Sequence, residues 1–234
     1  MQADDVRRAL KELADPRIAE HSQRFFKTGK GEYGEGDRFL GIRVPVLRKQ
    51  VVAFKDLPLS ATWQLLESPW HEERLFALLM LVRKFSRGDD ATQTAIYRRY
   101  LESTPRINNW DLVDSSAHQI VGGYLKSRDR QPLYELARSS SLWERRIAII
   151  ATYRYIKSDD FTDTLKLAAL LRDDPEDLIH KAVGWMLREV GKRDGGVERA
   201  FLAQHYRDMP RTMLRYAIEK FPAEERQAYL RGTA

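Results

Sequence analysis

The sequence predicts an all-α fold built as a solenoid of helical hairpins. Apolar residues recur three and four positions apart almost throughout, as in Leu75, Leu78, Leu79 and Val82, which is the periodicity of a helix. No convincing stretch alternates between polar and apolar residues, as a half-buried strand would. Similar helical segments also return at a nearly fixed interval, which is typical of repeat proteins whose stacked helix pairs share one core.

Helix-breaking residues divide the chain into roughly a dozen helices of ordinary length. Proline lacks an amide hydrogen and glycine readily adopts turn conformations, so each of them marks an expected boundary. In chain order the boundaries are Asp15-Pro16, Gly29 to Gly36, Pro45, Pro58, Pro69, Gly88, Pro105, Pro132, Asp174-Pro175, Gly195-Gly196, Pro210 and Pro222.

The repeat is marked by a basic residue near the start of each inner helix. Arg146 and Lys181 are 35 residues apart, and Lys181 and Arg215 are 34 apart. Arg74 lies 72 residues before Arg146, or two such steps, with the segment around Trp110 as a degenerate unit between them. Equivalent helices of stacked hairpins line one face, so these bases would form a basic track suited to duplex DNA. For any single base, ordinary solvated charge remains the alternative.

Length and composition limit the classes of protein that are possible. The chain has 234 residues and 43% hydrophobic content, which suits one compact domain over residues 1–234. Cysteine is absent, which excludes disulfides, thiolate zinc sites and a cysteine nucleophile and fits a reducing, cytoplasmic location. The N-terminal residues lack the apolar core of a signal peptide, and the longest apolar run, Leu75 to Val82, has eight residues. We therefore expect no membrane span.

The charge balance favours a polyanionic partner. Lysine and arginine number 40 against 34 acids, which gives a net charge of +6 and a pI near 9.5. The segments 143–157 and 181–193 each contain four bases and one acid, so each has a net charge of +3. Such a concentration of positive charge is expected where a protein contacts nucleic acid.

Two candidate sites are rejected on their patterns. The glycine-rich stretch from Gly29 to Gly36 has Glu35 where a phosphate-binding loop needs lysine, and no strand precedes it. We interpret it as a mobile loop that could touch a DNA backbone. The five histidines, at 21, 71, 118, 180 and 205, show no ligand spacing, and His71-Glu72-Glu73 does not match a zinc-protease helix. We expect no metal and no cofactor.

The segment 106–115, with the sequence RINNWDLVDS, is the most unusual. Trp110 lies four residues before Asp114, so the two share one face if the segment is helical. An indole beside a carboxylate would then be available for chemistry. The alternatives are that Asp111 or Asp114 caps a helix ahead of the apolar run 120–125 and that Trp110, Trp143 and Trp185 are core residues.

Four segments resemble a known family: FLGIRVPVLRK at 39–49, NWDLVDS at 109–115, LWERRIAI at 142–149 and KAVGWMLRE at 181–189. Together, and in this order over nearly the whole chain, they resemble the AlkD family of bacterial DNA alkylation-repair glycosylases, which are built from HEAT-like helical repeats. The resemblance implies a right-handed, C-shaped α-solenoid whose basic concave face holds DNA.

The resemblance also implies site residues. Trp110 and Asp114 match the family's active-site Trp and Asp, Trp185 matches its second active-site Trp, and Arg146 matches its cleft arginine. Arg43 and Arg48 occupy positions like those that contact DNA from the first repeats, and Arg188 resembles a further backbone contact. From the repeat pattern and the charge we add three further candidate DNA contacts, Arg145, Lys181 and Arg215.

The activity implied is that of a monofunctional glycosylase that hydrolyses the N-glycosidic bond of cationic N3- or N7-alkylated purines in duplex DNA without flipping the base. A monomer would suffice for this reaction. One alternative is a non-catalytic HEAT-repeat protein that binds damaged or branched DNA. Another is a helical-repeat scaffold for a protein partner, which would leave the basic and aromatic residues unexplained.

Overall fold

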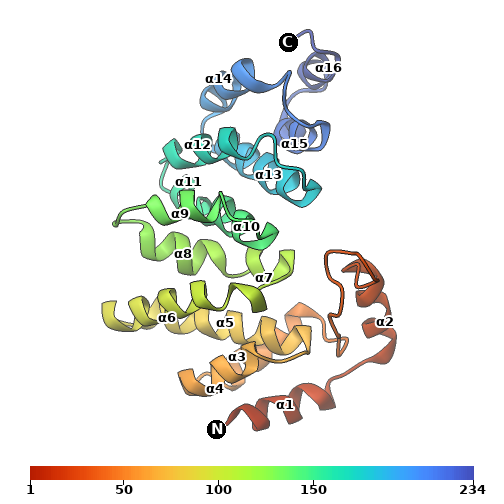
Figure 1. Cartoon of the computed structure of the whole chain (residues 1–234), viewed down its shortest axis with the longest axis vertical. Coiled ribbons are helices and arrows are strands. Elements are labelled where there is room, and N and C mark those ends of the chain that lie inside the picture. Colours follow the sequence, from red (N-terminus) through yellow and green to blue (C-terminus); the bar gives the residue numbers. More distant parts are fainter. The chain divides into compact units, whose positions relative to one another are not determined.

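The computed structural model describes residues 1–234 and confirms the all-α prediction. It contains no strand, and one isolated bridge pairs Arg38 with Trp70. The chain forms two compact units, Met1–Ser116 and Ala117–Ala234 (Figure 1). The single domain expected over residues 1–234 stays a prediction.

The first unit consists of seven α-helices and one short 3-10 helix. They are α1 (Ala3–Glu12), α2 (Pro16–Phe25), α3 (Val44–Ala53), α4 (Leu59–Leu66), α5 (His71–Arg87), α6 (Asp90–Glu102), η1 (Thr104–Arg106) and α7 (Trp110–Asp114).

Helix α5 is the centre of this unit. It contains the longest apolar run of the sequence, and every residue from 71 to 81 is buried. A helix that is apolar on all sides needs neighbours on all sides, and α5 packs against α3, α4, α6 and α7. The first turn of α5 therefore lies inside the unit, although it consists of the four ionisable residues His71 to Arg74.

The second unit consists of nine α-helices and one short 3-10 helix. They are α8 (Ala117–Leu125), α9 (Gln131–Leu136), α10 (Leu142–Ala151), α11 (Tyr153–Ile156), α12 (Thr162–Leu170), α13 (Asp177–Arg193), α14 (Gly195–His205), α15 (Arg211–Ala217), η2 (Ile218–Lys220) and α16 (Ala223–Arg231). Helix α13 is central here, since it packs against α10, α11, α12, α14 and α15.

The repeat read from the sequence corresponds to real helices in the second unit. Arg146, Lys181 and Arg215 are each the fifth residue of their helix, in α10, α13 and α15. Helix α13 packs against both α10 and α15, and the three follow one another through the unit (Figure 1). Gly184 permits the close approach of α13 to α15, because a Cβ there would lie 2.4 Å from the Met213 carbonyl oxygen. This packing is that of stacked helical repeats.

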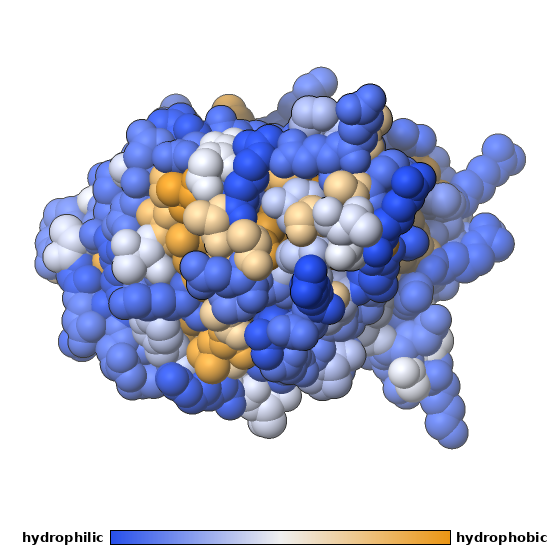
Figure 2. Space-filling model, turned by 90° about the horizontal axis from the view of Figure 1, so that it is seen from above, coloured by the Kyte–Doolittle hydropathy of each residue, from blue (hydrophilic) through white to orange (hydrophobic).

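One face of the molecule is mostly polar. The face seen in Figure 2 is dominated by hydrophilic residues, with hydrophobic residues in patches between them. No helix is both long and apolar enough to cross a membrane.

Candidate functional site

The candidate catalytic residues of the first unit share the short helix α7. The predicted helical spacing is confirmed, because Trp110 and Asp114 are its first and last residues. Leu112 and Val113, between them, are completely buried and anchor the helix to the core, whereas Trp110 and Asp114 are half-buried. Neither aspartate of the segment is its N-terminal cap. That position belongs to Asn109, whose side-chain oxygen accepts a hydrogen bond from the Trp110 amide at 2.8 Å.

The Trp110 indole lies against the end of α2. It stacks on Phe26, with ring centroids 5.2 Å apart, and meets the edge of Phe25 at 5.9 Å. Phe26 is half-buried and also stacks on Phe39, whereas the Phe25 side chain is 57% exposed. The indole is therefore fixed from one side by aromatic packing, with a solvent-facing phenylalanine beside it.

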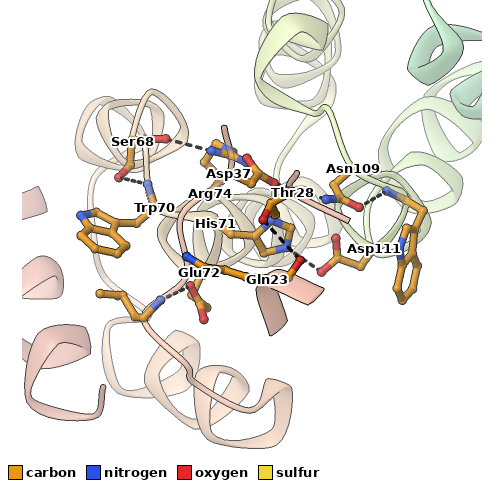
Figure 3. A network of polar contacts seen from close by, with 12 residues as sticks. Gln23, Thr28, Asp37, Ser68, Trp70, His71, Glu72, Arg74, Asn109 and Asp111 are labelled. Carbon is orange, nitrogen blue, oxygen red and sulfur yellow. Dashed lines mark hydrogen bonds and ion pairs between the residues drawn. The ribbon is translucent and has the colours of Figure 1, made fainter. Parts of the chain in front are cut away.

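A buried histidine links α5 to α7. His71 Nε2 lies 2.8 Å from Asp111 Oδ2, and His71 Nδ1 lies 3.0 Å from Asp37 Oδ2. Figure 3 shows the imidazole between the two carboxylates, with Arg74 beside Asp37. Arg74 donates to Asp37 Oδ1 at 2.5 Å, and the Asn109 amide donates to Asp37 Oδ2 at 3.2 Å. Asp37 thus accepts three side-chain hydrogen bonds.

These contacts change the protonation of both partners. Burial alone would lower the pKa of His71, but the charges and hydrogen bonds of Asp111 and Asp37 outweigh it and raise that pKa to about 9. Burial would raise the pKa of Asp37, yet the hydrogen bond from His71 and the charge of Arg74 hold it below its ordinary value. The pair is therefore an imidazolium and a carboxylate at neutral pH.

The glycine-rich loop, Gly29 to Gly36, leads into this arrangement. The Gly29 amide donates to the Glu32 carboxylate at 2.9 Å and the Gly31 amide to the Glu35 carboxylate at 2.8 Å. These amides are occupied by the loop's own acids, which agrees with the rejection of a phosphate-binding loop. Gly34 is buried and a Cβ there would lie 2.4 Å from the Phe26 carbonyl oxygen, so glycine is required where the loop turns inward toward Asp37.

The predicted DNA contacts of the first unit lie on α3. Arg43 is its N-terminal cap residue, and Arg48 is the fifth residue of the helix. Both side chains are exposed, as a phosphate contact requires.

In the second unit, Trp185 and Arg188 share α13 and one carboxylate. Trp185 Nε1 donates to Glu189 Oε1 at 3.0 Å, and Arg188 Nε lies 3.7 Å from the same oxygen. Arg188 also donates to Glu219. The Trp185 ring lies 6.1 Å from that of Tyr153 and is half-buried, so it is neither a core residue nor fully exposed.

The two arginines of α10 are held by hydrogen bonds inside the second unit. Arg146 is only 5% exposed, and its Nη1 donates to the Leu178 carbonyl. Arg145 forms an ion pair with Asp174, with Nε 2.6 Å from Oδ2. The bond of Arg146 ties α10 to the first turn of α13, and the bond of Arg145 ties it to the segment before α13. By contrast, Lys181 is partly exposed and pairs with Asp177 at 2.8 Å, and Arg215 is exposed.

A family model for DNA alkylation repair enzymes matches residues 6–221. The chain belongs to the DNA alkylation repair enzyme family. The resemblance seen in the four sequence segments is thereby confirmed, and with it a role in DNA alkylation repair.

The fold has a relative of known structure. The chain is similar to a predicted DNA alkylation repair enzyme from Enterococcus faecalis, at 16% sequence identity and a TM-score of 0.69, over 90% of this chain and 98% of that chain. At this identity the likeness establishes the fold alone. No curated protein matches the chain.

The sequence patterns of this DNA alkylation repair family member do not indicate the buried histidine and its partners. The spacing of His71 excludes only a metal site, and no pattern singles out Asp37. A usable signal was present, because the four ionisable residues of the sequence HEER directly precede the longest apolar run. Charged residues at the start of a helix that is buried on all sides must be paired, which predicts partners elsewhere in the chain.

Proposed function

We propose that this member of the DNA alkylation repair enzyme family is a monofunctional DNA glycosylase. It hydrolyses the N-glycosidic bond of cationic N3- or N7-alkylated purines in duplex DNA and leaves the base stacked while it does so. The observation that carries the proposal is α7, which presents an indole and a carboxylate one turn apart on a helix anchored at both its cap and its core. Family membership supports the substrate class.

The chemistry needs only one carboxylate. An alkylated purine carries a positive charge and is already a good leaving group, so no acid has to protonate it, unlike the oxygen leaving group of an ordinary glycoside. As the bond to C1′ breaks, positive charge develops on the deoxyribose. Asp114 stabilises this charge and orients the attacking water. Asp111, the other acid of α7, is paired with His71 and is not needed for the step.

The tryptophans contribute their ring faces. Trp110 lies along the sugar and stabilises the developing cation through its π system, and Trp185 stays a predicted residue with the same role. Each indole is half-buried and packed against another aromatic ring, so its orientation is restricted before DNA binds. Such restriction lowers the entropy that binding would otherwise cost.

DNA binding is assigned to the basic residues. Arg43, Arg48, Lys181 and Arg215 are exposed or partly exposed and are the direct phosphate contacts of the proposal. Arg145, Arg146 and Arg188 stay predicted contacts, and DNA would replace part of their present hydrogen bonds. The monomeric state and cytoplasmic location also stay predictions.

The test is the substitution Asp114→Asn, which keeps the shape of the side chain and removes its charge. Release of 7-methylguanine from methylated duplex DNA should fall by about 100-fold or more, because the positive charge on the sugar loses its counter-ion. The dissociation constant for the same DNA should change little. Asp56→Asn, an exposed acid of the same unit, is the matched control and should keep full activity. Full activity of the Asp114 variant would refute the assignment, and salt-sensitive binding without base release by the wild type would favour the non-catalytic alternative.

A further inference from the structure

Five polar residues of the first unit form one buried network, here called the His71 cluster: Asp37, His71, Arg74, Asn109 and Asp111. They come from the end of the glycine-rich loop, the first turn of α5 and the start of α7, so three distant parts of the sequence meet there (Figure 3). Asp37, His71 and Asp111 do not form a group that could hold a metal ion. The contacts of the cluster instead fix one segment against another.

The charges of the cluster balance only when the histidine is protonated. Asp37 and Asp111 contribute two negative charges, and Arg74 contributes one positive charge. A neutral imidazole has a single N–H and could donate to only one of the two carboxylates, whereas an imidazolium donates to both. Because His71 is only 2% exposed, water cannot replace a lost hydrogen bond, and an unbalanced buried carboxylate would be costly.

The cluster holds α7 at two points. His71 binds Asp111 in the first turn of the helix, and Asp37 binds the amide of Asn109, whose side-chain oxygen caps Trp110. The ring of His71 also lies 5.0 Å from that of Phe26, which stacks on the indole of Trp110. The orientation of α7 therefore depends on the imidazolium through hydrogen bonds and through aromatic packing.

We infer that His71 is a positioning residue for the proposed glycosylase site. As an imidazolium bridging Asp37 and Asp111, it holds α7 so that Trp110 and Asp114 face the DNA together, and loss of its proton releases Asp111 or Asp37 and lets the helix shift. The inference rests on the proposed function for its effect on base release. Its effect on Trp110 can be measured without any activity.

The pH at which His71 loses its proton follows from the groups around its imidazole ring. The charged groups acting on His71 are Asp111 of α7 and Asp37 after the loop, and Arg74 shares Asp37 with it. The rings that pack on it, Phe26 and Phe39, carry no charge. With a pKa of about 9 in the folded protein, the bridge is complete at neutral pH and is lost as the pH rises through 9.

A spectroscopic experiment on the whole chain tests the link between His71 and α7. In a pH titration followed by nitrogen NMR, both His71 nitrogens should carry protons at neutral pH and titrate near pH 9, and the Trp110 indole signal should shift with the same midpoint. His71→Gln and Trp110→Phe assign the two signals. Asp111→Asn keeps an oxygen acceptor but removes a charge, so it should lower the midpoint. Titration of His71 near its ordinary value, or a Trp110 signal indifferent to it, would overturn the inference.

A kinetic experiment tests the consequence for the reaction. The measured quantity is the ratio of the single-turnover base-release rates of wild type and His71→Gln at each pH, in which the titration of the substrate cancels. At neutral pH the wild type should release the base about 10-fold faster or more, because a small displacement of reacting groups slows the reaction strongly. Above pH 9 the ratio should approach one, because the wild type has then lost the imidazolium as well. His205→Gln, a half-buried histidine of the second unit, should give a ratio near one throughout.

The outcomes separate the two proposals. If His71→Gln fails to fold, Asp111→Asn replaces it, and its alkaline loss of activity should begin at a lower pH than that of the wild type. A ratio that stays constant with pH would contradict a positioning role for the imidazolium. If the wild type releases no base at all, the proposed function fails, while the NMR titration still decides whether His71 controls the orientation of Trp110.

Discussion

Helices α5 and α13 are both 17 residues long and each is the central helix of its unit, but they use their charged residues differently. In α5 the first turn, His71 to Arg74, is buried, and its charges pair with residues inside the unit. In α13 the charged residues near the start are at the surface, with Asp177 exposed and Lys181 partly exposed. The first helix pairs its charged residues inside its unit, and the second presents its charged residues at the surface.

The same difference appears within the repeat. The basic residue that marks each repeat is buried at Arg74 and Arg146 but accessible at Lys181 and Arg215. A repeated sequence position therefore sets the place of a residue in its helix without setting its exposure. Charge at one repeat position serves internal packing in some repeats and an open surface in others.

The largest expected effect separates the two helices by stability. Asp37→Ala leaves Arg74 and the imidazolium buried without a shared counter-ion, and should lower the free energy of unfolding by about 3–5 kcal/mol. Asp177→Ala removes the exposed partner of Lys181 and should cost less than about 1 kcal/mol. Urea unfolding of both variants measures the difference. Equal losses would show that the cluster of α5 is no more important to the fold than an exposed ion pair.

A second, smaller effect is the pH dependence of stability. The pKa of His71 is raised in the folded protein, so its contribution is complete below the ordinary value of 6.5 and is lost as the pH rises through about 9. The loss should be on the order of 3 kcal/mol. Urea unfolding of the wild type and His71→Gln between pH 7 and 10 measures it, because other titrating groups are common to both. Parallel stability curves would contradict the protonated cluster.

The fold could be predicted from sequence because its signals are local. The three- and four-residue apolar spacing depends only on neighbouring positions, and it gave the all-α class correctly, although the structure has sixteen α-helices instead of roughly a dozen. The repeat step placed Arg146, Lys181 and Arg215 at the same position of successive helices. The spacing of Trp110 and Asp114 likewise required only that one short segment be helical.

The His71 cluster could not be predicted in this way. Its bonds join residues 34, 40 and 72 positions apart, and no periodicity relates Asp37, His71 and Asn109. The burial of Arg146 could not be predicted for the same reason. It depends on the Leu178 carbonyl of another helix, which accepts a hydrogen bond from the guanidinium. Tertiary contacts, which a local pattern does not contain, decide which ionisable residues are paired inside and which remain at the surface.

The most direct test of the central claim is to identify what the purified wild-type protein removes from methylated duplex DNA. A glycosylase should release free 3-methyladenine or 7-methylguanine and leave one abasic site for each base released, with the DNA backbone intact. Loss of the methyl group with the purine still attached to the sugar, or release of no base beyond the spontaneous rate, would contradict the account.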